Sequence, residues 1–177
     1  QKAKAILERA RFNIANSINC SIDEIIFTSG GSISNNLALI GTLNKGDHFI
    51  TSSYEHPAIL NVLKFIKSKK VEISILKPEK TGLIDPDKVK SAIKKNTKLI
   101  SIMYINNEIG TINPIQEISR IALENKILFH TDAVQTMGKI NLDVKASMVD
   151  MLSLSGHKFY APKGVGMLYV KQNTKIN

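Results

Sequence analysis

Cysteine is nearly absent from this sequence, which contains only Cys20. A single cysteine excludes an internal disulfide framework, and no close set of cysteines and histidines has the spacing of a zinc site. Cys20 lies in a polar turn with no histidine or helix start placed to activate it, so we interpret it as a structural or incidental thiol. The sequence also lacks any run of about 18 apolar residues, which excludes a membrane-spanning helix.

Acidic residues are fewer than basic ones, with 15 Asp and Glu against 24 Lys and Arg, which gives a formal net charge of +9. Such a balance can indicate a nucleic-acid partner. The basic residues, however, are almost all lysines spread over the expected helices and turns, and no arginine–aromatic cluster accompanies them. We therefore expect a solvated, lysine-rich surface that binds neither nucleic acid nor a membrane directly.

Residues 1–4 lead into an amphipathic pattern rather than a signal peptide, so we do not expect them to act as a targeting signal. This predicts a cytoplasmic protein, or one of an organelle matrix if a targeting segment lies upstream. The amphipathic pattern begins without a Ser, Thr, Asp or Asn cap, which is typical of a chain cut from something longer.

The 177 residues, 43% of them hydrophobic, are enough for one α/β domain with a sizeable core. Apolar runs alternate with helical patterns, and the run 99–105 is long and continuous, as a parallel sheet covered on both faces requires. We expect helices over residues 3–18, 35–43, 57–66, 85–93 and 116–124, and strands over 25–28, 48–51, 71–76, 99–105, 127–130 and 151–154, with 164–170 as a hairpin partner of the last.

The first expected strand breaks into a glycine turn, Ser29-Gly30-Gly31-Ser32, before a helix. A strand, a glycine turn and a helix start present free backbone N–H groups and the positive end of the helix dipole, which suit a phosphate. The turn has neither the Gly-Lys-Ser/Thr of a Walker loop nor a Gly-x-Gly-x-x-Gly fingerprint, so nucleotide binding is disfavoured. A plain tight turn is the alternative.

Polar residues follow three further expected strands, at the sheet edge where ligands bind in open parallel sheets. His56 precedes Pro57 at a helix start, where it is a ligand-contacting ring or a capping or surface histidine. Asn106 and Asn107 offer amides to a ligand, or form an Asx turn. Asp132 follows a buried strand, so a cation or a set of donors should answer its charge: a heterocycle with a protonated nitrogen, a lysine or a helix N-terminus.

The last candidate stretch is Ser155-Gly156-His157-Lys158-Phe159, which follows the apolar run 151–154. A lysine at the end of a buried strand has an ammonium group that is hard to solvate, and this frees a neutral amine to attack carbonyls. The serine and histidine can hold a phosphate beside that amine. The alternative is a surface loop with one of the chain's many lysines.

Together these residues fit one cofactor, pyridoxal 5'-phosphate, whose aldehyde reacts with amines and whose ring nitrogen draws in electrons when protonated. The set comprises a phosphate cradle, a ring, two amides, a carboxylate and an amine, contributed by Gly31, Ser32, His56, Asn107, Asp132, Gln135, Ser155, His157 and Lys158.

The chain resembles the central part of the large domain of a cysteine desulfurase of the NifS/IscS kind, in the class V aminotransferase group of fold type I pyridoxal phosphate enzymes. The motifs that carry the resemblance run in the family's order: Phe27-Thr28-Ser29-Gly30, Ser34-Asn35-Asn36, Glu55-His56, Asn106-Asn107-Glu108-Ile109-Gly110, His130-Thr131-Asp132-Ala133-Val134-Gln135 and Ser155-Gly156-His157-Lys158. The resemblance implies a three-layer α/β sandwich with a mostly parallel sheet, in which residues 1–177 are a partial cofactor-binding domain without the N-terminal arm and the C-terminal small domain.

The resemblance also implies a role for each site residue. Lys158 would link covalently to the cofactor and take the substrate's α-proton, and His56 would stack on the ring and relay protons. Asp132 would pair with the ring nitrogen, whereas Asn107 and Gln135 would contact the cofactor's phenolic oxygen or the substrate. The phosphate would be held by Gly31, Ser32, Ser155 and His157.

By the same resemblance the parent protein converts L-cysteine to L-alanine and passes sulfur to an acceptor or iron–sulfur scaffold protein, as a homodimer. Two departures stand out. Ile33 replaces a glutamate that the family usually has, and the family's sulfur-accepting cysteine loop and carboxylate-binding arginine have no counterpart here. We therefore expect this chain alone to bind cofactor without desulfurase turnover. Alternatives are selenocysteine lyase, a class V aminotransferase, or a non-catalytic scaffold of the same fold.

Overall fold

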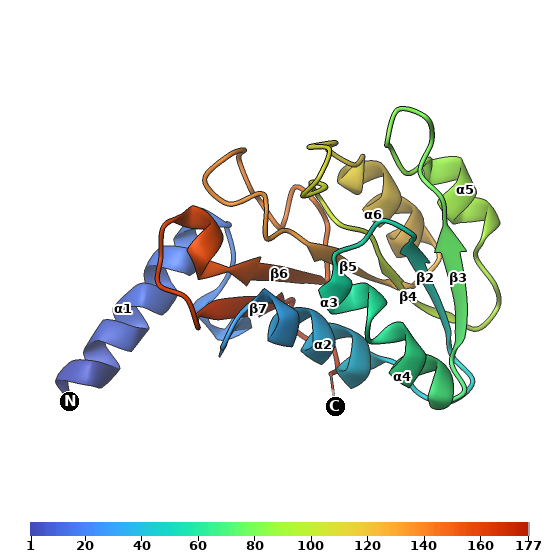
Figure 1. Ribbon diagram of the computed structural model, residues 1–177. Coiled ribbons are helices and arrows are strands. Elements are labelled where there is room, and N and C mark those ends of the chain that lie inside the picture. The colour runs from blue at the N-terminus through green and yellow to red at the C-terminus, as the bar shows by residue number, and fades with distance from the viewer. Residues whose placement is uncertain (177) are drawn as a thin grey trace.

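A single mixed sheet of seven strands forms the centre of the protein, in the order β1-β7-β6-β5-β4-β2-β3. A computed structural model describes residues 1–176 (Figure 1). The strands are β1 (Ile25–Thr28), β2 (His48–Ser52), β3 (Glu72–Leu76), β4 (Thr97–Ser101), β5 (Leu128–Asp132), β6 (Met151–Ser155) and β7 (Gly166–Val170). Because β7 runs antiparallel to both β1 and β6, the other six strands share one direction, and their carboxyl ends meet at one edge.

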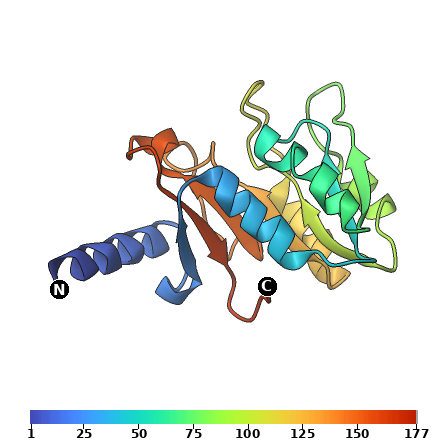
Figure 2. The same cartoon turned by 60° about the horizontal axis from the view of Figure 1, so that its bottom comes forward.

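Helices cover both faces of this sheet, which makes three layers (Figures 1 and 2). Their bounds are α1 (Lys2–Ser17), α2 (Gly31–Thr42), α3 (Pro57–Leu60), α4 (Leu63–Ser68), α5 (Pro86–Ser91) and α6 (Ile115–Glu124), with short 3-10 helices η1 (Ile22–Glu24) and η2 (Gly156–Phe159). The expected three-layer sandwich with a mostly parallel sheet is confirmed.

Alternation along the strands builds two apolar cores. Phe49, Leu99 and Met151 point to the layer of α2, α3 and α4, and the next residue of each strand points to the layer of α5 and α6. Residues of both sets are fully buried, so each central strand contributes to both cores at once. Two-sided burial of this kind explains why the strands read as continuous apolar runs.

Helix α1 is packed only at its C-terminal end. Ala15 and the following Ile18 are buried in a core, whereas Ile6 and Phe12 are 70% and 55% exposed. Figures 1 and 2 both show α1 extending away from the body of the protein. Among residues 1–176, no helix combines the length and the apolar character needed to cross a membrane.

Two expected elements differ from the structure. The strand expected over 99–105 is β4, which ends at Ser101, because Ile105 leaves the sheet and forms an antiparallel bridge with Ile112 around a turn at Gly110, whose φ is 72°. The helix expected over 57–66 is broken between α3 and α4. Its apolar periodicity survives the break, because Ile59 and Ile66 are both buried in the same core.

Candidate active site

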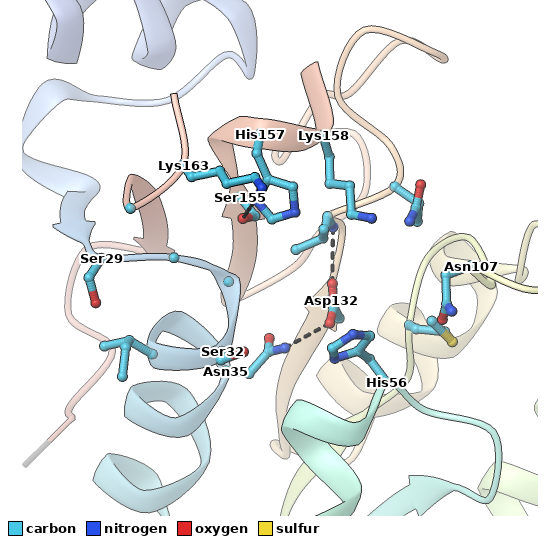
Figure 3. A pocket seen from close by; sticks show the side chains of 17 residues that line it. Ser29, Ser32, Asn35, His56, Asn107, Asp132, Ser155, His157, Lys158 and Lys163 are labelled. Atoms are coloured by element: carbon cyan, nitrogen blue, oxygen red, sulfur yellow. Dashed lines mark hydrogen bonds between the residues drawn. The ribbon is translucent and has the colours of Figure 1, made fainter. Parts of the chain in front are cut away.

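All nine residues predicted for the site line one cavity of about 420 Å³ at the carboxyl edge of the sheet (Figure 3). They come from the ends of β1, β2, β4, β5 and β6, and are Gly31, Ser32, His56, Asn107, Asp132, Gln135, Ser155, His157 and Lys158. A parallel sheet gathers these segments because the carboxyl ends of its strands meet at one edge. Eight further residues complete the lining: Ser29, Gly30, Ile33, Asn35, Met103, Val134, Lys163 and Gly164. Of these, Ser29 and Gly30 belong to the glycine turn that was predicted to suit a phosphate.

The first turn of α2 forms one wall of the cavity. Gly31 lies so close to the turn after β5 that an added Cβ would stand 2.8 Å from Cγ2 of Val134 and 3.2 Å from Cβ of Ser155. Thr28 stabilises the turn, because its hydroxyl forms a hydrogen bond of 2.8 Å with the hydroxyl of Ser34 in α2. Gly31 and Ser32 line the cavity at the start of α2. Since the first N–H groups of a helix have no partner inside it, this helix start is a candidate anion site.

Asp132, the last residue of β5, holds a buried carboxylate at the floor of the cavity and is 4% exposed. The side chain of Asn35 donates to Oδ2 at 2.7 Å, and the backbone N–H of Val134 donates to Oδ1 at 3.0 Å (Figure 3). Burial raises the pKa of Asp132, although these two donors and the neighbouring imidazole of His56 act in the opposite direction. A ligand with a protonated ring nitrogen would supply the cation that this carboxylate lacks.

His56 both caps a helix and lines the cavity, so the capping role and the position facing a ligand that the sequence left as alternatives occur together. Its Nδ1 accepts a hydrogen bond from the N–H of Ala58 at 3.1 Å at the start of α3, and Pro57 occupies the first helical position. An accepting Nδ1 places the ring proton on Nε2. The ring is exposed to the cavity, next to Asp132 (Figure 3).

Of the two asparagines after β4, one forms the Asx turn and the other lines the cavity. Asn106 is buried and forms the Asx turn, since its Oδ1 accepts from the N–H groups of Glu108 at 2.9 Å and Ile109 at 3.0 Å. Asn107 is exposed and lines the cavity. Asn106 therefore shapes the turn that presents Asn107.

The Ser155–Lys158 segment follows β6 as the short helix η2. The hydroxyl of Ser155 lies 3.0 Å from Nδ1 of His157, which fixes both side chains at the same wall of the cavity. Lys158 lies beyond the strand and is exposed, so the burial that the sequence suggested for it is wrong. The buried part of the segment ends at Gly156.

Three of the residues that line the cavity were not predicted to do so, each for a different reason. Asn35 is separated from Asp132 by 97 positions, so only the fold reveals their contact, although Asn35 stands one helical turn after the glycine turn. Lys163 lies in the loop before β7, where a lysine carries no local signal. Ile33, 49% exposed, was noted only as a departure from a family pattern, and it is part of the cavity wall.

Cys20 does not belong to this cavity. It packs against the core below α1, and burial raises the pKa of its thiol to about 11. The interpretation of Cys20 as a thiol without an activated role agrees with this environment.

Comparison with known proteins gives the same family along the entire chain. The family model "Aminotransferase class-V" matches residues 1–177. Cysteine desulfurase IscS of Dictyoglomus turgidum is 51% identical over the whole chain, and cysteine desulfurase IscS of Methanosarcina thermophila is 46% identical over 99% of it. A solved structure described as "SspA in complex with cysteine" superposes with a TM-score of 0.95 at 44% identity over 99% of the chain.

The chain spans about half the length of these proteins, covering 46% and 44% of the two desulfurases and 52% of the solved structure. The structural likeness confirms the expected fold, that of fold type I pyridoxal phosphate enzymes. With a family match over its full length and relatives well above 30% identity, the chain belongs to the aminotransferase class-V family.

Proposed function

We propose that this chain is the cofactor-binding large-domain part of a pyridoxal phosphate-dependent cysteine desulfurase. The observation that carries the proposal is the single cavity in which a lysine amine, a buried carboxylate and a helix N-terminus meet. The names of the most similar relatives, and the cysteine bound to one solved neighbour, support the same activity and the substrate L-cysteine.

The residues present fit this cofactor. The amides of Gly31 and Ser32, with Ser155 and His157, would hold its phosphate, because a helix start and paired polar side chains offer several donors to one anion. Asp132 is buried and has no full positive charge against it. It would pair with the protonated ring nitrogen, and this pairing would offset the free energy that burial of its carboxylate costs.

The remaining residues would act on the proton that the reaction removes. Bound pyridoxal phosphate supplies an electron-withdrawing ring that stabilises negative charge at the substrate's α-carbon. The amine of Lys158 would take the proton from that carbon, and Nε2 of His56 would exchange protons on the ring face. Asn107 and Gln135 would orient the substrate or the phenolic oxygen; Gln135 itself is held by Nζ of Lys139 at 2.6 Å.

None of these cavity residues is a cysteine that could accept the sulfur. Among the residues that the structure describes, Cys20 is the free cysteine, and it lies outside the cavity. The proposed full-length protein would act as a homodimer and pass sulfur to an acceptor or iron–sulfur scaffold protein.

Covalent trapping tests the proposal. The protein is mixed with pyridoxal phosphate, reduced with borohydride, and the labelled peptide is mapped by mass spectrometry. Because two lysines line the cavity, Lys158→Ala is compared with the matched control Lys163→Ala. We expect label on Lys158 alone, abolished by the first substitution and retained by the second. Scattered label, or label that Lys158→Ala leaves in place, would contradict the proposal and favour a scaffold without cofactor chemistry.

A further inference from the structure

Glu55 is a fully buried carboxyl group directly behind the cavity, and the proposed function gives it no role. It is 3% exposed and precedes His56 in the turn after β2. Its Oε1 accepts hydrogen bonds from the hydroxyl of Ser52 at 2.5 Å and from the backbone N–H of Met103 at 3.0 Å. Within residues 1–176, its Oε2 is buried with no hydrogen-bond partner.

An ionised carboxylate would be very unfavourable in this position. An anionic oxygen that is removed from water and receives no hydrogen bond costs far more than a neutral hydroxyl oxygen in the same place. The carboxylate of Asp132, at the end of β5, repels a negative charge on Glu55 and so also raises its pKa. Ser52 and Met103, which face Glu55 from β2 and the end of β4, are uncharged. Burial, the largest effect, raises the pKa of Glu55 to about 8.

The contact with Met103 joins two segments that carry site residues. After Ser52 the chain of β2 turns away from β4, so the N–H of Met103 has no strand opposite it, and the Glu55 side chain takes the place of a backbone acceptor. A second contact joins the same segments, because Nδ2 of Asn106 donates to the carbonyl of Tyr54 at 3.1 Å. One segment continues into His56 and the other into Asn107, and Figure 3 shows these two side chains extending from neighbouring loops.

We propose that Glu55 is a neutral positioning residue: its protonated carboxyl group fastens the turn that carries His56 to the turn that carries Asn107. Glu55 acts through these two side chains and touches neither substrate nor cofactor. The proposal rests on the proposed function only in that His56 and Asn107 are taken to contact the cofactor.

The first arm of the test needs no cofactor. Urea unfolding is followed from pH 5 to pH 9 for the parent protein, Glu55→Gln and Glu55→Leu. Glutamine keeps an acceptor for Met103 and carries no charge, whereas leucine keeps the volume and removes the acceptor. We expect Glu55→Gln to match the parent near pH 5 and to become more stable than it as pH rises towards 8. A Glu55→Gln protein that is less stable than the parent at every pH would overturn the neutral state.

The second arm separates positioning from mere support of the fold. The apparent dissociation constant for pyridoxal phosphate is measured with and without His56→Ala in the parent, Glu55→Gln and Glu55→Leu backgrounds. We expect His56→Ala to weaken binding about tenfold in the first two and less than threefold in the third, where the ring is already misplaced. An equal effect in all three backgrounds would overturn the positioning role.

The design distinguishes this proposal from the proposed function. If the parent protein binds no pyridoxal phosphate, the proposed function fails and the positioning of cofactor-contacting groups fails with it, whereas the unfolding arm still decides whether Glu55 is a neutral clamp. If Glu55→Leu does not fold, the His56→Ala comparison is made with Glu55→Asp, whose shorter side chain withdraws the acceptor from Met103.

Discussion

The hydrogen bond between Asn35 and Asp132 supports the cavity floor, and its removal has a calculable cost. Nδ2 of Asn35 is 2.7 Å from Oδ2 of Asp132, and the two residues are 1% and 4% exposed. A hydrogen bond to a charged group contributes about 1.5–3 kcal/mol to stability, more than a bond between neutral groups. We therefore expect Asn35→Ala to lower the free energy of unfolding by about 2 kcal/mol at pH 7, measured by urea denaturation followed by circular dichroism.

The pH dependence of this loss identifies its origin. Burial raises the pKa of Asp132, and the amide of Asn35 lowers it by stabilising the ionised form. Without Asn35 the pKa of Asp132 rises further, so the loss should be full where the carboxyl group is ionised and should shrink as pH falls through that pKa. Asn36→Ala is the matched control, because Asn36 is the next residue of α2 and makes no hydrogen bond to Asp132.

A double-mutant cycle can refute this reasoning. If the Asn35 amide acts through Asp132, Asn35→Ala should cost close to nothing in an Asp132→Ala background, and the coupling between the two positions should exceed about 1 kcal/mol. An equal loss in both backgrounds, or a loss that does not change with pH, would show that Asn35 stabilises α2 independently of the carboxylate.

Three further predictions concern other buried or half-buried positions. Gly31→Val should lower the free energy of unfolding by about 1–3 kcal/mol in urea titrations, because its Cβ would stand 2.8 Å from Cγ2 of Val134; a stabilised variant would contradict the close approach. Burial lowers the pKa of His130 to about 3, so stability should fall as pH drops below 6.5, by about 2 kcal/mol at pH 5 relative to pH 7, and His130→Asn should lose this dependence. Because partial burial raises the pKa of Cys20 to about 11, iodoacetamide should alkylate it at pH 8 far more slowly than after unfolding, as mass spectrometry would show; equal rates would refute this partial burial.

The sequence predicts the cavity lining well because its signals are local. The parallel strands that carry the site are mostly apolar, and the polar residues that follow them lie at the carboxyl edge whatever the details of packing. Lys158 shows the limit of this argument. The apolar run before it indicates a buried strand, but η2 separates the lysine from that strand and leaves it exposed. Burial could not be extrapolated past the strand's end.

Asn35 and Glu55 could not be predicted as site residues from local patterns. Each is one of several polar residues in a helix or a turn, and its role in the site depends on a hydrogen-bond partner far away in the sequence. Asn35 meets Asp132 across 97 positions, and Glu55 meets Met103 across 48. Such contacts depend on the order of strands in the sheet, which places β4 beside β2 and β5 beside β4. No periodicity in the sequence encodes that order.

The misplaced end of β4 and the missed role of Glu55 have the same physical cause. At the carboxyl edge β2 ends beside β4, so backbone groups on that side of β4 lose their partners while the side chains around them stay buried. Met103 shows both effects: it is 2% exposed, its N–H donates to Glu55, and its carbonyl accepts from Nδ2 of Asn113 at 2.7 Å. The apolar run therefore continues past Ser101, where backbone bonds to β5 persist through Tyr104 but pairing with β2 has stopped. Buried polar side chains complete the hydrogen bonding that β2 would have given. A polar residue soon after an apolar strand is thus a candidate either for the ligand or for the backbone beneath it, and burial decides between them: His56 is exposed to the cavity, whereas Glu55 is enclosed.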